Sequence, residues 1–152
     1  MRAYGLTVLR LSVASVFIAH GLQKLLGLWG GPGLHGTAAM LKGLGLPFPM
    51  PLAAVLTATE LGGGILLALG WLTPWVALAL AVDMGVAIWK VHYPHGFFLA
   101  AGNRGQGIEF VLVLLGALLC LAFSGPGALS IDHWRNRHHE ERARGRARIR
   151  KV

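Results

Sequence analysis

Six ionisable side chains lie inside or at the edges of long apolar runs, where charged groups are costly and usually functional. They are His20, Lys24, Glu60, Asp83, Lys90 and Glu109. Imidazole, ammonium and carboxyl groups bind polar ligands and hold or move protons, and burial tunes how readily they do so. The residue types therefore indicate a ligand-binding or proton-handling site, which must be built by helices that cross a membrane.

Four of these residues are the candidate catalytic groups: His20, Lys24, Glu60 and Glu109. His20 and Lys24 are four residues apart and share one helix face. Glu60 lies about eight residues from the outer end of the next apolar run, which matches the depth of His20. Glu109 opens the last run, where a carboxylate also favours the positive end of the helix dipole. We expect one polar cluster in the outer half of the protein.

A structural interpretation of the same residues stays open. Lys24 in apolar surroundings pairs with an acid, and an ion pair with Glu60 or Glu109 would only tie helices together. A metal site is not predicted, because His92 and His95 give no helical i, i+4 pair of ligands. Asp83 has two interpretations. It is a structural residue, as a protonated acid or one hydrogen-bonded to a neighbouring helix, or it is part of a proton path.

Four apolar segments must position these groups, at residues 6–28, 52–72, 75–91 and 108–123. The chain is 55% hydrophobic and only 13% charged. A bilayer core about 30 Å thick needs about 20 helical residues, and helices satisfy their own backbone in lipid. The predicted fold is all-α: a polytopic membrane protein with a four-transmembrane-helix bundle, its first segment retained as a span.

The charge pattern sets the expected domains and orientation. Residues 1–134 form the membrane domain, and residues 135–152 form a basic tail that we expect to be cytoplasmic, against anionic lipid headgroups. Positive charge marks the inner side, so both termini are predicted to be cytoplasmic, in a multi-pass cell (inner) membrane protein. Nucleic acid is not expected as a partner, because basic residues are not interleaved with aromatic ones.

Two further patterns concern the spans. Small residues recur every four positions, at Ala54, Ala58 and Gly62 and at Ala77, Ala81 and Gly85. Such stripes let membrane helices approach closely, within the chain or in a homodimer. Aromatic residues, Trp89 among them, lie near the predicted segment ends, as in an aromatic belt.

Several motifs together resemble the DoxX family of small four-span membrane proteins. They are FIAHGLQKLLG (17–27), GLGLPFPMP (43–51), TELGGGILLALGWLTPWVALAL (59–80), IEFVLVLL (108–115) and GPGALSIDHW (125–134). The first resembles the family's F-x-x-H-G-x-x-K pattern, and the last its terminal G-P-G-x-x-S-x-D signature. The resemblance covers roughly residues 8 to 134 and leaves the basic tail outside.

The resemblance implies a link to quinone-dependent oxidoreductase complexes that handle sulfur, thiols or oxidative stress. We expect a protein that supports such chemistry beside a protein partner, as a possible subunit of a membrane oxidoreductase complex, and whether it is itself an enzyme stays open. A quinone would lie against His20, Lys24, Glu60, Trp89 and His92. The alternative is a non-enzymatic membrane scaffold, assembly factor or small-ligand carrier, as more distant relatives of the family suggest.

Overall fold

The computed structural model describes residues 1–99 and 107–138, and within these ranges the regular elements are all helices. Residues 131–138 form a further helix after the named elements. The elements are α1 (Arg2–Leu26), η1 (Leu28–Gly30), α2 (Gly33–Gly43), α3 (Pro49–Leu69), α4 (Thr73–Ala87), η2 (Ile88–His92), η3 (Tyr93–His95) and α5 (Glu109–Ser124).

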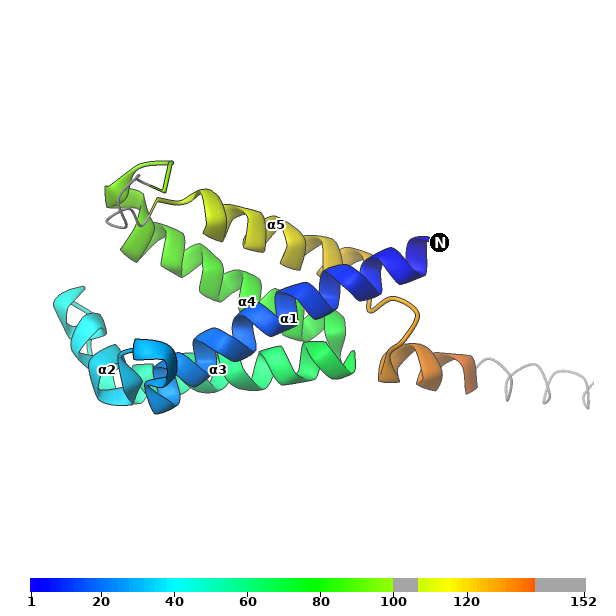
Figure 1. The fold of residues 1–152 in the computed structure, drawn as a ribbon, viewed down its shortest axis with the longest axis horizontal. Coiled ribbons are helices and arrows are strands. Elements are labelled where there is room, and N and C mark those ends of the chain that lie inside the picture. The colour runs from blue at the N-terminus through cyan, green and yellow to red at the C-terminus, as the bar shows by residue number, and fades with distance from the viewer. Residues whose placement is uncertain (100–106, 139–152) are drawn as a thin grey trace, which may run out of the picture.

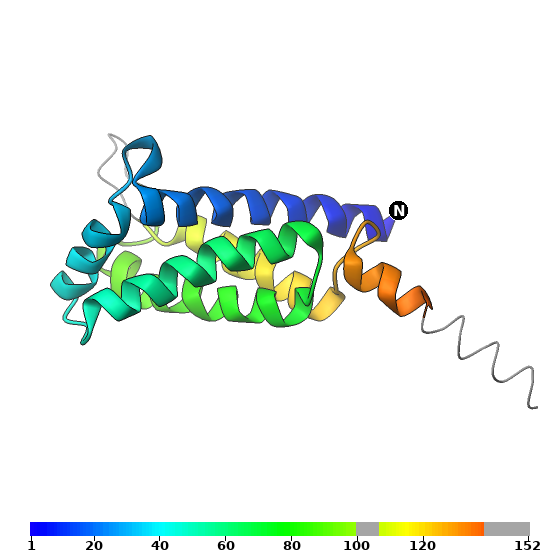
Figure 2. The ribbon, with the colours of Figure 1, turned by 90° about the horizontal axis from the view of Figure 1, so that it is seen from below.

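The helices α1, α3, α4 and α5 form an up-and-down bundle (Figures 1 and 2). Each helix packs on the next along the chain, and α5 returns to α1. Three helical stretches are long and apolar enough to cross a membrane: Arg2–Leu26, Pro49–Leu69 and Thr73–His95. The fourth, Glu109–Ser124, is shorter but apolar. The predicted all-α four-helix membrane bundle is confirmed.

The two ends of the bundle differ. One end, which we call the N-terminal end, carries the chain start, the turn between α3 and α4, and residues 125–138 (Figures 1 and 2). The other, the α2 end, carries α2, η2 and η3. The α1–α3 pair diverges from the α4–α5 pair toward the α2 end (Figure 1). Part of the expected basic tail, residues 139–152, lies outside the described residues.

The core is a column of apolar side chains from all four helices. Phe17, Leu67, Leu80 and Leu118 are each at most 2% exposed and belong to one cluster. The outward faces are apolar too: Val55 and Val82 are both 63% exposed. Helices that are apolar on all sides are typical of membrane spans, because exposing their outer faces to water would be unfavourable.

Glycine allows α1 and α3 to pack very closely. A Cβ added to Gly21 would lie 2.6 Å from the Leu61 Cβ and 2.7 Å from Leu61 backbone atoms. A Cβ on Gly64 would lie 2.9 Å from the Ile18 backbone nitrogen. Small residues at a membrane helix crossing bring the two backbones together. In the motif AHGLQK, Gly21 therefore brings the following turn of α1 against α3.

Buried polar side chains at the N-terminal end join the segment after α5 to the rest of the bundle. Arg10 of α1 is 1% exposed, and its guanidinium donates to the backbone carbonyls of Pro126 (2.9 Å) and Leu129 (2.5 Å). Asp132 accepts hydrogen bonds from the amides of Leu72 (3.0 Å) and Thr73 (2.8 Å) at the start of α4. The terminal GPGALSID motif is thus fastened to α1 and to the α3–α4 turn. We call these contacts the Arg10 clasp.

Candidate functional site

An ion pair between Lys24 and Glu60 joins α1 to α3 at the centre of the site. The Lys24 ammonium donates to Oε1 of Glu60, and the two side chains are 20% and 4% exposed. Glu60 lies 11 residues into α3, about 16 Å from the α2 end at 1.5 Å per residue. The pair therefore lies near the middle of the membrane-spanning part of α3.

Asp83 brings a second carboxyl group to this pair from α4. The Asp83 and Glu60 carboxyl groups are close enough to interact electrostatically. Glu60 Oε2 and Asp83 Oδ2 are both buried, and neither has a donor among the described residues. Two neighbouring carboxyl groups in an apolar site do not both ionise, because like charges repel there. The arrangement can therefore hold one proton between α3 and α4.

The Lys24–Glu60–Asp83 group opens into a cavity of about 630 Å³ between α2, α3 and α4. Its wall is mostly aliphatic, and the remaining polar side chains come from Thr59, Lys90 and His92. Ligand sites in proteins have this composition: a predominantly apolar pocket of several hundred Å³ with a few convergent polar groups. This cavity is the candidate functional site.

A π-helical turn shapes the α4 side of the cavity. Residues Ile88–His92 form η2, which continues α4 with the wider π hydrogen-bonding pattern. Its Lys90, Val91 and His92 line the cavity. Single π turns inside α-helices occur frequently at functional sites, because they redirect side chains. The turn adds a second lysine to the cavity, on the wall opposite Lys24.

The helix α2 supplies the part of the wall nearest the membrane surface. Met40 and Leu41 line the cavity, and Leu41 packs in a small core with Ala38 of α2 and Ala53 of α3. This helix lies in the first long connection between spans and begins at Gly33. Its burial against α3 was not predicted, because a weakly amphipathic segment does not itself identify the surface it covers.

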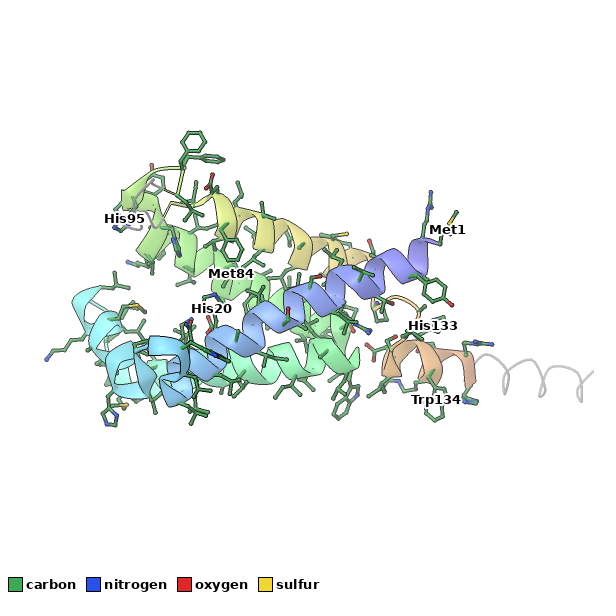
Figure 3. All side chains as sticks on the ribbon, viewed as in Figure 1. Met1, His20, Met84, His95, His133 and Trp134 are labelled. Carbon is green, nitrogen blue, oxygen red and sulfur yellow. The ribbon has the colours of Figure 1, made fainter. Side chains whose placement is uncertain are left out.

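His20 lies one turn before Lys24 on α1 and is close enough to Lys24 and Glu60 to interact electrostatically with both. Figure 3 shows His20 on the side of α1 that faces Met84 of α4. The residue is exposed and is not among those that line the cavity. His20 thus lies beside the polar group and contributes to its charge environment.

The remaining candidates divide between the cavity and the surface. His92 lines the cavity, whereas Trp89 is 66% exposed and its ring lies under the Lys90 ammonium, 3.9 Å from the ring centroid. Glu109 begins α5 and accepts a hydrogen bond from the Leu99 amide at 2.9 Å. Glu109 is not a lining residue, so the structure brings Lys24, Glu60, Asp83 and His92 together and places Glu109 apart.

In residues 1–99 and 107–138, no three His, Cys, Asp or Glu side chains are grouped to hold a metal ion. Cys120, the single cysteine of the chain, is exposed on α5. The chemistry that the cavity offers is therefore hydrogen bonding, charge and a proton held between carboxyl groups.

The fold and this cavity define the class: a multi-pass α-helical membrane protein with a polar site between its helices. The sequence profile of the DoxX family matches residues 5–93, more than half of the chain. The chain belongs to the DoxX family, as its motifs indicated. No solved structure matches it.

Curated relatives agree with this assignment. Inner membrane protein YphA of Escherichia coli K12 is 32% identical over 128 residues, which cover 84% of this chain and 87% of YphA. Inner membrane protein YqjF of the same organism is 32% identical over 139 residues, covering 88% and 93%. A Bacillus subtilis protein named "Putative oxidoreductase CatD" is 33% identical over 128 residues, covering 84% of each chain.

Proposed function

We propose that this chain binds the ring of a membrane quinone in the cavity and serves as the quinone-binding subunit of an oxidoreductase complex in the cell inner membrane. The observation that carries the proposal is the Glu60–Asp83 carboxyl pair, held by Lys24 beside a largely apolar cavity at mid-membrane depth. The names of YphA, YqjF and CatD support the location and the reaction class.

The cavity fits a neutral ring with carbonyl oxygens better than an anion. Lys24 and Lys90 can donate hydrogen bonds to a carbonyl oxygen, and the Lys24 charge is already matched by Glu60, so Lys24 is not available as the counter-ion of a phosphate or carboxylate ligand. A phospholipid headgroup also belongs at the membrane surface, whereas Glu60 lies about 16 Å along α3. Aliphatic side chains such as Leu41, Leu52 and Val86 would cover the faces of a ring.

Quinone reduction to quinol consumes two electrons and two protons. In this proposal the electrons come from a partner oxidoreductase, because the chain has one cysteine and no dithiol of its own. Glu60 and Asp83 hold one proton at the cavity wall, and Lys24 keeps Glu60 oriented. A carboxyl pair in a dry site can release and regain a proton as the charge nearby changes.

The competing function is a scaffold in which Lys24 and Glu60 only fasten α1 to α3. The observation that favours it is that Lys24 already donates a hydrogen bond to Glu60 Oε1, so the pair needs no ligand to be satisfied. Asp83 distinguishes the two functions, because a tie between α1 and α3 does not need a second acid from α4.

The test is quinone content, measured by mass spectrometry of organic extracts from gently purified protein. Asp83→Leu removes the shared proton, and Lys24→Met removes the donor, whereas Glu109→Gln changes an acid outside the cavity. We expect near-stoichiometric quinone in wild type and in Glu109→Gln, and loss from folded Asp83→Leu and Lys24→Met. Wild-type protein that carries no quinone and takes up none when it is added would overturn the proposal and favour the scaffold.

A further inference from the structure

A second groove of about 410 Å³ lies beside the cavity, between α3 and α4, and is lined by apolar side chains apart from Thr59. The two spaces share wall residues: Val55, Thr59 and Ala79 line both. From this shared wall the groove follows α3 toward the N-terminal end, past Gly62 to Leu66. The polar cavity and this mainly apolar groove are therefore neighbours along α3.

Small side chains leave the groove open. Ala58 and Gly62 belong to the stripe that the sequence analysis assigned to close helix packing, but here they line the groove. A Cβ added to Gly62 meets no atom within 4 Å. By contrast, Ala77 and Ala81 of the second stripe are at most 4% exposed and pack in the core. The α3 stripe thus creates space rather than a helix contact.

A buried polar group lies next to the wall that the two spaces share. Glu60, which lines the cavity and directly follows Thr59, is 3% exposed, and its Oε2 has no hydrogen-bond partner in the described part of the chain. The groove runs from Val55 to Leu66, which is 11 residue steps along α3, or about 16 Å. An occupant that fills both spaces therefore has a polar head at Glu60 and a slender apolar chain at least several carbons long.

We infer that the α3–α4 groove binds the isoprenoid tail of the quinone whose ring occupies the cavity, so that the site selects long-tailed quinones over tailless ones. This inference rests on the proposed function and names its substrate class. The tail would lie along Gly62 toward Leu66, within the apolar layer of the membrane. Transfer of methylene groups from water into the groove is favourable, so even a partly buried tail raises affinity.

The experiment compares two probes on the purified full-length protein in detergent: a benzoquinone without a side chain, and the same ring with a short isoprenoid tail. Binding is measured by titration calorimetry. Gly62→Leu and, separately, Ala58→Leu place a side chain in the groove. Gly116→Leu is the matched control, because Gly116 of α5 lines neither space and its Cβ also meets no atom within 4 Å.

We expect wild type and Gly116→Leu to bind the tailed ring at least about tenfold more tightly than the tailless ring, a difference of about 1.4 kcal/mol. Gly62→Leu and Ala58→Leu should lose most of this preference while binding the tailless ring within about twofold of wild type. Thermal unfolding of each variant checks that the bundle is intact.

Three results would overturn the inference. Equal affinity of wild type for both probes means that the groove does not bind the tail. Unchanged tail preference in both folded groove variants excludes the groove as the tail site. A dimeric wild type that Gly62→Leu makes monomeric, with tail preference intact, assigns the groove to a second copy of the chain. A fourth result, in which wild type binds neither ring, would instead contradict the proposed function, because it would show that the chain binds no quinone.

Discussion

Glu60 of α3 and Asp83 of α4 line one cavity, and their carboxyl groups are close enough to interact electrostatically. Lys24 neutralises Glu60 from a third helix. Because two neighbouring carboxyl groups in an apolar site retain one proton between them, the three side chains together require no further counter-ion. This arrangement explains how an apolar bundle accommodates two acids and one base at mid-membrane depth.

The Lys24–Glu60 pair should show strong energetic coupling. Lys24→Met leaves a buried carboxylate without its partner, which typically costs about 3–5 kcal/mol. Adding Glu60→Gln removes the uncompensated charge, so the double variant should lose less stability than the sum of the single variants. Unfolding in mixed detergent micelles gives the free energies.

The control is Arg135→Ala, whose exposed contact with Asp132 at 3.9 Å should contribute at most about 1 kcal/mol. Additive losses would mean that the two residues do not act as a pair.

Gly21→Ala should separate α1 from α3. Its Cβ would lie 2.6 Å from that of Leu61, so the helices must move apart, at a cost of about 1–3 kcal/mol. Gly5→Ala is the matched change in the same helix, because its Cβ meets no atom within 4 Å. Gly5→Ala should be neutral or stabilise by up to about 1 kcal/mol through helix propensity. Thermal unfolding of both variants checks the prediction, and equal stability of the two would contradict it.

Arg10→Lys should loosen the segment after α5. A single ammonium does not reproduce the guanidinium fork that reaches both Pro126 and Leu129, so the clasp should lose about 1–3 kcal/mol. Amides of residues 127–132 should then exchange with deuterium faster, while those of the α1–α3 contact change little. Arg2→Lys is the control, since Arg2 is exposed on the same helix. Unaltered exchange in Arg10→Lys would show that the clasp does not stabilise this segment.

The proposed orientation gives a labelling prediction. Positive charge after α5, including Arg135 and Arg137, predicts that the N-terminal end faces the cytoplasm. In a Cys120→Ala background, His133→Cys should react with a membrane-impermeant maleimide only after cells are permeabilised. His35→Cys in α2 should react in intact cells. The reverse pattern would invert the orientation and would place the cavity's α2 wall on the inner side.

Hydropathy predicted the bundle because each span must satisfy its own backbone in lipid, and this constraint acts locally along the chain. The depth of each residue in the membrane also predicted that Lys24 lies near Glu60, since both positions can be counted from the ends of their spans. The counting argument did not separate Glu109 from the cluster, because depth gives no information on which helix faces which. In the structure Glu109 instead binds the Leu99 amide.

Other parts of the site depend on tertiary contacts that leave little trace in the sequence. Asp83 was recognised as costly, but its neighbour could not be named before the α3–α4 contact was known. The π turn at Ile88–His92 has no distinct residue pattern. Arg10 could have been identified from its place among apolar residues, since a buried arginine needs acceptors. The GPGALSID motif was the pattern that could have supplied those acceptors, because its glycines and proline interrupt regular structure and leave backbone carbonyls without helix partners.

The Arg10 clasp also sets an order of events during biosynthesis. The carbonyl acceptors of Arg10 lie 116 and 119 residues later in the chain. At a synthesis rate of about 5–20 residues per second, the nascent first span waits about 6–23 seconds for them. Until then its guanidinium must be solvated by lipid headgroups or by the insertion machinery. A chain truncated before residue 126 never acquires the acceptors, so its arginine stays unmatched inside the first span, where an unpaired charge is costly.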